Sequence, residues 1–208
     1  YDRWKAAGGE GEIPAHDPRL DALDYAPGHL DVDVVTTLPG LKTDIKKRYL
    51  HEINRSTDRL LIESAYFVDD TIIGALKSKA QDGVSTTVIV PSDEKHNIKL
   101  VRDSFKWVQN DVVRSGVQLY KYRERMVHSK VAAFDGRVCT LGSANLDNLA
   151  LTKLAEANIF VNDAGFTQIM EQRVFEIDIP ASDLVRVEKT SWWKRVKSGV
   201  LHFFRSWL

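Results

Sequence analysis

The chain of 208 residues is long enough to bury a full hydrophobic core, and its composition of 43% hydrophobic and 28% charged residues is ordinary for a globular protein. Its 29 basic and 29 acidic side chains balance, so no global excess of positive charge points to nucleic acid as a partner. The single cysteine, Cys139, excludes an internal disulfide and a multi-cysteine zinc site. No stretch approaches the ~20 apolar residues that a membrane-spanning helix needs. Because the chain begins at Tyr1 in the middle of a pattern, we expect a fragment or a processed piece.

The first 29 residues are polar, contain glycine and proline, and show no sustained periodicity, which is typical of a linker. From residue 30 the pattern becomes regular and predicts strands that alternate with helices. The strands are expected over 30–37, 59–65, 85–91 and 117–122, and the helices over about 42–55, 71–81 and 97–114. Such alternation implies crossover connections and a largely parallel sheet.

The rhythm changes after residue 122. Two strand-like runs, "VHSKVAAF" and "RVCTLGS", are separated by Asp135 and Gly136 alone, which is a strong signal for a hairpin with a two-residue turn. A further strand is expected over 156–162 and a helix over about 164–175. We therefore expect an α/β fold, a mixed sheet sandwiched between helices on both faces, over residues 30–188.

The hairpin predicts where its polar side chains lie. With a two-residue turn, Lys130 stands opposite Leu141 and His128 stands opposite Ser143. Side chains alternate along a strand, so His128, Lys130 and Ser143 share one face, and Asn145 follows just beyond the strand end. The sequence thus groups an imidazole, an ammonium, a hydroxyl and a carboxamide at one end of the sheet, where ligands of open α/β sheets usually bind.

This group of side chains suits a phosphodiester. The imidazole of His128 can act as a nucleophile or as a general acid and base near neutral pH. Lys130 supplies a positive charge for the non-bridging oxygens, and Ser143 with Asn145 adds neutral donors. With so many donors we expect neither a metal nor another cofactor.

The spacing of these residues is more specific than any of them alone. His128-x-Lys130, four residues, Asp135, six residues, and Gly142-Ser143-x-Asn145 follow one another. The sequence here resembles the phospholipase D superfamily, whose signature is HxK-x4-D-x6-GSxN, and all six fixed positions match. Asp135 lies seven residues from His128, roughly 23 Å along a strand at ~3.3 Å per residue, so we expect it to set the hairpin turn and not to touch the same phosphate.

The resemblance extends from about residue 30 onward and is closest to the second half of bacterial cardiolipin synthases, which carry two such motifs. It implies a double displacement through a phosphohistidine, in which His128 is the general acid and base and a second motif comes from the same longer chain or from another subunit. It also implies that Glu156 holds the catalytic histidine, although an exposed residue at the start of a strand is the alternative. Leu149 and Leu154 stand where the family often has Arg and Asn. The resemblance therefore does not define the substrate pocket.

Two weaker candidates for substrate contact, Tyr66 and His96, follow the ends of predicted strands; the alternative for His96 is a solvated loop. The tail over 189–208 has five Lys or Arg and no acidic residue, with aromatic residues at helical spacing. This is the composition of an interfacial membrane anchor, although the same stripe could pack on the other half or on a partner subunit. The expected membrane contacts are Trp192, Trp193, Phe203, Phe204 and Trp207.

These features predict a phosphatidyltransferase of the cardiolipin synthase type, which moves a phosphatidyl group from a phospholipid to an alcohol. We expect it at a membrane surface, peripherally bound, on the cytoplasmic face of a bacterial membrane. A nuclease of the same superfamily is the alternative, although the neutral net charge disfavours nucleic acid. A third possibility is a half without catalytic function that supports its partner, and the complete motif argues against it.

Overall fold

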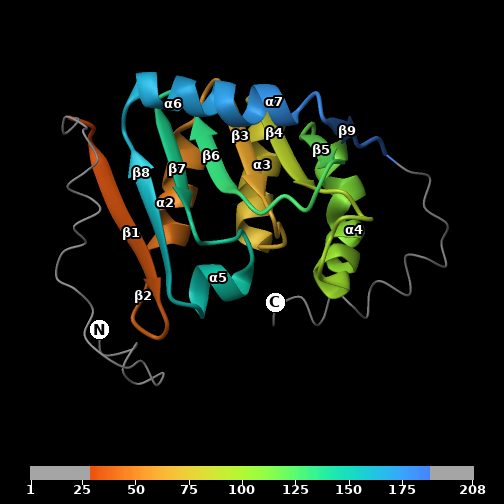
Figure 1. Ribbon diagram of the computed structural model, residues 1–208, viewed down its shortest axis with the longest axis horizontal. Coiled ribbons are helices and arrows are strands. Elements are labelled where there is room, and N and C mark those ends of the chain that lie inside the picture. The colour runs from red at the N-terminus through yellow and green to blue at the C-terminus, as the bar shows by residue number, and fades with distance from the viewer. Residues whose placement is uncertain (1–28, 188–208) are drawn as a thin grey trace, which may run out of the picture.

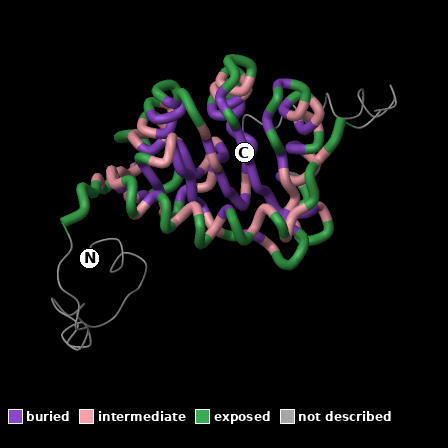
Figure 2. The backbone as a smooth tube through the Cα atoms, turned by 90° about the horizontal axis from the view of Figure 1, so that it is seen from above, coloured by how far each residue is buried: buried purple, intermediate pink, exposed green. Residues whose placement is uncertain are grey.

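The computed structural model describes residues 29–187, and this part of the chain folds around one nine-stranded sheet (Figure 1). Seen from above, α2, α3 and α4 pack on one face of the sheet and the α6–α7 segment packs on the other, with the buried residues between the layers (Figure 2). The expected α/β sandwich with helices on both faces is confirmed.

The elements expected over residues 30–175 are all present, and their bounds differ from the prediction by a few residues. The strands are β1 (Val32–Leu38), β2 (Lys42–Thr43), β3 (Arg59–Ser64), β4 (Ser85–Pro91), β5 (Gln118–Tyr122), β6 (Lys130–Phe134), β7 (Val138–Gly142), β8 (Glu156–Val161) and β9 (Ser182–Leu184). The helices are α2 (Asp44–Arg55), α3 (Asp70–Gln81), α4 (Lys99–Arg114), α5 (Asn148–Thr152), α6 (Ala164–Met170), the π-helical turn η2 (Glu171–Phe175) and α7 (Glu176–Asp178). The elements that periodicity missed, β2, α5 and β9, are too short to carry a pattern.

The expectation of a largely parallel sheet is wrong. The strand order is β2-β1-β8-β7-β6-β3-β4-β5-β9, and within the described residues only β3–β4 and β4–β5 are parallel neighbours. After β5 the chain returns through the β6–β7 hairpin and β8, and these three antiparallel strands insert between β1 and β3. The connection through β2 and α2 therefore joins β1 to β3, two strands that run in the same direction but are not neighbours.

The two faces of the sheet bury separate cores. On the face of α2 and α3, Tyr49 packs edge-to-face against Phe134 and Phe160, with ring centroids 6.0 and 5.7 Å apart. On the face of α6 and η2, a smaller core holds Phe175 and Cys139. Alternation along β6 sends Ala132 to the first core and Ala133 to the second, so this strand is buried on both faces.

The predicted two-residue turn is also wrong, by one residue. Phe134 pairs with Val138, so the loop has three residues, and both Asp135 (φ 51°) and Gly136 (φ 62°) lie in the left-handed region. The backbone N–H of Asp135 donates to the carbonyl of Arg59 at 2.8 Å, which extends the β6–β3 ladder past Phe134. Arg137, which was expected to pair with Phe134, is thus the residue that stays out of the hairpin ladder and lengthens the loop, and its backbone N–H donates to the Phe134 carbonyl at 3.0 Å.

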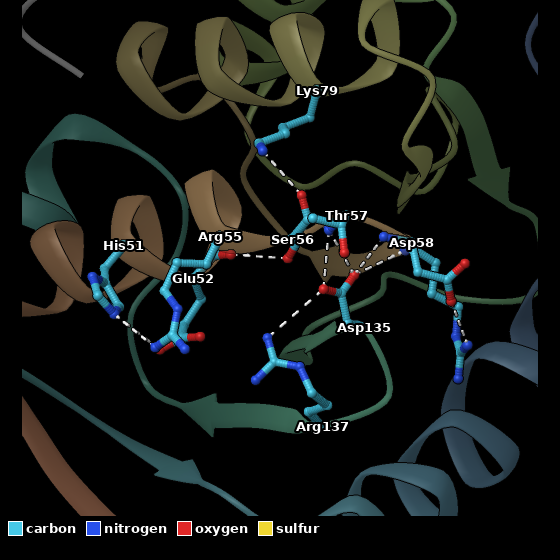
Figure 3. A network of polar contacts seen from close by, with 10 residues as sticks. His51, Glu52, Arg55, Ser56, Thr57, Asp58, Lys79, Asp135 and Arg137 are labelled. Atoms are coloured by element: carbon cyan, nitrogen blue, oxygen red, sulfur yellow. Dashed lines mark hydrogen bonds and ion pairs between the residues drawn. The ribbon is translucent and has the colours of Figure 1, made fainter.

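The Asp135 side chain explains why the loop holds this shape. Its carboxylate accepts the backbone N–H groups of Thr57, Asp58 and Arg59 at 3.0–3.2 Å, as the close view in Figure 3 shows. Arg137 adds an ion pair at 3.7 Å. Asp135 therefore ties the hairpin loop to the connection between α2 and β3.

Candidate active site

The candidate site lies at the edge of the sheet where α5 sits, opposite the Asp135 loop (Figure 1). Strands β3 and β7 end at this edge, and β6 and β8 begin there. Because these four neighbouring strands run antiparallel to one another, residues that are 30 to 90 positions apart in the sequence meet at one rim.

His128 and Lys130 lie on the same side of this rim. The Lys130 ammonium donates to the His128 carbonyl at 2.7 Å and lies 3.3 Å from its Nδ1 atom. His128 is exposed, whereas Lys130 is only 7% exposed. The two groups are therefore neither on opposite faces nor sealed in apolar packing, and the imidazole remains open to a substrate.

The charge of Lys130 is balanced by two carboxylates. Burial lowers the pKa of Lys130, and the nearby charges of Glu156 and Asp147 oppose that change because they favour the ammonium. A buried ammonium close to two carboxylates is a partner for the non-bridging oxygens of a phosphate.

Ser143 joins the site by a different route from the one expected. Val131 pairs with Leu141, so the shifted register places Lys130 one step further, opposite Gly142. Ser143 stands just past the end of β7, where its hydroxyl donates to the carboxylate of Glu156 and its backbone N–H donates to the Ala157 carbonyl at 3.0 Å. Ser143 thus contacts Glu156 at the start of β8. The predicted cross-strand pairing of Ser143 with His128 is wrong.

The expected hold of Glu156 on the catalytic histidine stays a prediction, because the carboxylate's hydrogen bond in the structure goes to Ser143. Asn145 is half-buried, and its side-chain oxygen has no hydrogen-bond partner among the described residues. A carboxamide in this state has an acceptor to offer to an incoming hydroxyl.

Gly142 owes its place in the motif to packing. A Cβ atom at this position would collide with the Asn158 carboxamide and the Ala157 carbonyl. Asn158 pairs with Gly142 across the ladder, and its buried side-chain oxygen accepts the backbone N–H of Ala144 at 3.2 Å. Asn158 therefore shapes the loop that carries Ser143 and Asn145, a role that the sequence analysis missed and that its position inside a strand does not signal.

Asp147 was also missed. It is the N-cap of α5, where its carboxylate accepts the backbone N–H of Ala150 at 2.8 Å. Burial raises its pKa, and the charges of Glu156 and Asp69 add to that effect. The signal was available, because an aspartate directly before the run "NLAL" is a typical N-cap.

Tyr66 and His96 come together at the ends of β3 and β4. Their rings stack 5.6 Å apart, and the Tyr66 hydroxyl donates to Asn97 at 3.0 Å. Burial, followed by the charge of Arg102, lowers the pKa of His96. The Tyr66 carbonyl accepts the backbone N–H of Leu146, which connects this pair to the loop after Asn145. Substrate contact by Tyr66 and His96 stays a prediction.

Other predictions concern residues that the structure does not describe. The expected linker lies almost wholly in residues 1–28, and the basic helix with its five aromatic membrane contacts lies in 188–208. Within residues 29–187, no cluster of three or more histidine, cysteine, aspartate or glutamate side chains could hold a metal ion. No helix among the described elements is both long and apolar enough to cross a membrane.

Comparison with known families decides the wider relationship. The family model "Cardiolipin synthase, PLD-like domain" matches residues 49–177, more than half of the chain. This chain belongs to that family. Its phospholipase D-like domain is 32% identical over 169 residues to cardiolipin synthase B of Salmonella typhi, a match that covers 79% of this chain. The match covers 40% of that relative, so the chain spans less than half the length of the full synthase.

Solved structures agree with the phospholipase D-like fold. Phosphatidylserine synthase from Haemophilus influenzae superposes with a TM-score of 0.68 at 12% identity, covering 88% of this chain and 49% of that one. Nuc, a phospholipase D family member from Salmonella typhimurium, superposes with a TM-score of 0.63 at 17% identity, covering 76% of this chain and 99% of that one. At these identities the likeness shows the fold alone.

Proposed function

We propose that this domain supplies one half of the active site of a phosphatidyltransferase of the cardiolipin synthase type. The observation that carries the proposal is the open rim where His128 and Lys130 lie side by side next to the Ser143–Glu156 pair. The 32% identity to cardiolipin synthase B supports a phospholipid as the substrate.

The proposed reaction is a double displacement without a metal. A histidine of the other motif, outside this chain, attacks phosphorus, the bond to the leaving alcohol breaks, and protonated His128 gives its proton to the leaving oxygen. The acceptor alcohol then gives a proton to His128 and attacks the phosphohistidine. The bond between phosphorus and the nucleophilic histidine breaks, and that histidine is released. Lys130 stabilises the non-bridging oxygens in both steps.

The second motif is proposed to come from the remainder of a longer chain or from another subunit. This is supported by the length of the relatives, of which this domain spans 40%. We further propose peripheral binding to the cytoplasmic face of a bacterial membrane, with the basic aromatic tail as the contact, because a lipid-transferring site must reach the bilayer surface.

The test is lipid product analysis of the complete enzyme with phosphatidylglycerol vesicles. His128→Ala should abolish transfer, and His51→Ala, which removes an exposed histidine on α2, should leave the rate unchanged. A parallel assay with a labelled oligonucleotide examines the alternative nuclease. Equal lipid product with and without His128, or cleavage of the oligonucleotide in place of lipid transfer, would overturn the proposal.

A further inference from the structure

A second polar cluster lies next to the start of β6, on the face of the sheet opposite to Lys130. It lines a pocket of about 460 Å³ between the start of β6 and the η2–α7 segment. The polar side chains around this pocket are Glu63, Tyr122, Arg125, Ser129, Arg173 and Asp178, and His128 stands on its border. We refer to it as the Glu63 pocket.

Glu63 connects this pocket to the catalytic residues. It is a β3 residue, only 2% exposed, and it pairs with Val131 across the β3–β6 ladder. The hydroxyl of Ser129 donates to its Oε1 atom. Ser129 stands between His128 and Lys130 in the sequence, so this one bond holds the residue that separates the two catalytic side chains.

The hydrogen bond between Ser129 and Glu63 lies where the backbone of β6 is not yet paired. Strand β6 begins at Lys130, so His128 and Ser129 precede the paired part of the strand. Backbone pairing therefore fixes Lys130 more firmly than it fixes the two residues before it. A side-chain bond from Ser129 to the neighbouring strand restricts this entry segment and, with it, the direction of the imidazole.

The second oxygen of Glu63, Oε2, is buried and has no hydrogen-bond donor among the described residues. Burial raises the pKa of Glu63 to about 7, the Ser129 bond lowers it, and the neighbouring Asp178 carboxyl raises it. Arg125 acts in the lowering direction. The carboxyl of Glu63 therefore changes its charge near neutral pH.

We infer that Glu63 is a positioning residue that acts through Ser129 to orient His128 and Lys130 for the proposed transfer. This inference rests on the proposed function. An ionised Glu63 accepts the Ser129 hydroxyl in a charge-assisted bond, whereas the protonated carboxyl accepts it more weakly. The orientation is therefore best when Glu63 is ionised, and the rate should rise with pH as it loses its proton.

The groups that face Glu63 predict how this rise responds to mutation. They come from every element around the pocket: Tyr122 at the end of β5, Arg125 in the loop, Ser129 and His128 before β6, Arg173 in η2 and Asp178 in α7. Removing the negative charge of Asp178 favours the ionised form of Glu63, so Asp178→Asn should move the rise to lower pH.

The experiment is the pH profile of kcat for the complete enzyme on phosphatidylglycerol vesicles. Glu63→Gln and Ser129→Ala should each lower kcat at pH 8 on the order of 10-fold with little change in KM, as expected when orientation and not binding is lost. Glu63→Gln should also remove the rise near pH 7. The double variant should be no slower than either single variant, because both remove the same bond.

Two outcomes would overturn the inference: additive losses in the double variant, or a Glu63→Gln profile that keeps the rise near pH 7. If Glu63→Gln does not fold, Ser129→Ala and Asp178→Asn test the same bond without altering the buried carboxyl. Failure of the proposed function looks different, because His128→Ala would then transfer lipid as well as the unmodified enzyme does.

Discussion

The Asp135→Ala substitution should remove a large part of the stability of this domain without touching its chemistry. The carboxylate accepts three backbone N–H groups, from Thr57, Asp58 and Arg59, and its side chain is 9% exposed. Water can reach part of the 57–59 connection, so we assign each lost bond about 1 kcal/mol, the middle of the usual range. Alanine at φ 51° adds about 1 kcal/mol of backbone strain. The total is about 4 kcal/mol.

Asp135→Asn is the matched variant. Asparagine tolerates the left-handed backbone and keeps one acceptor oxygen, so we expect a loss of only about 1–2 kcal/mol. Urea unfolding followed by circular dichroism measures both variants. A loss below about 1 kcal/mol for Asp135→Ala would refute the reasoning, because the three backbone donors would then have been satisfied without the carboxylate.

The pH dependence of unfolding gives an independent check. Burial alone would raise the pKa of Asp135, but the backbone N–H groups of Asp58, Thr57 and Arg59 outweigh it and hold the pKa below its usual 3.8. A carboxyl with a lowered pKa contributes its full stability above that usual value and loses it as the pH falls through the folded-state pKa. The unmodified domain should lose this contribution in acid, whereas Asp135→Asn, which cannot titrate, should not. Identical acid slopes would contradict the assignment.

Three further outcomes follow from particular contacts. Gly142→Ala should lower the free energy of unfolding by about 1–3 kcal/mol and lower the transfer rate, because the new methyl group collides with Asn158. The control Gly74→Ala, in the open middle of α3, should be neutral or stabilising by up to ~1 kcal/mol. Urea unfolding and product analysis compare the two variants. Glu63, with its pKa raised from 4.5 to about 7, should make the domain less stable as the pH rises from 4.5 to 7, and Glu63→Gln should flatten that slope in thermal unfolding. Burial raises the pKa of Cys139 to about 12, so iodoacetamide should label this thiol only after denaturation, as mass spectrometry would show.

The parts of the fold that the sequence predicted are those coded by neighbouring residues. Alternation and helical periodicity over 6 to 16 residues placed β4 to the residue and α2 and α3 within two residues. The strand order could not be read in this way. The pairing of β1 with β8 joins residues more than 110 positions apart, and nothing in the β1 sequence distinguishes β8 from β3 as its neighbour.

The site divides along the same line. The motif spacing predicted His128, Lys130 and Ser143 as site residues, and in the structure Lys130 lies against His128 while Ser143 bonds Glu156 at the same rim. The register that was meant to explain their meeting was one residue off, because Phe134 pairs with Val138 and Arg137 stays in the loop. The role of Glu63 could not be predicted from the sequence. Its contact with Ser129 exists only because β3 pairs with β6, and a lone acidic residue inside an apolar strand does not indicate that pairing.

The two ends of the β6–β7 hairpin are therefore each held by hydrogen bonds to residues outside the hairpin. At the loop end, Asp135 is bonded to the connection before β3, which ties the loop to that connection. At the open end, Asn158 of β8 holds the backbone after Gly142, and Glu63 of β3 holds Ser129. A hairpin that is held from both flanking strands keeps the side chains of His128 and Ser143 oriented, even though both residues lie past its paired part. Loss of either flanking bond should thus reduce the rate before it reduces stability, whereas loss of Asp135 should do the reverse.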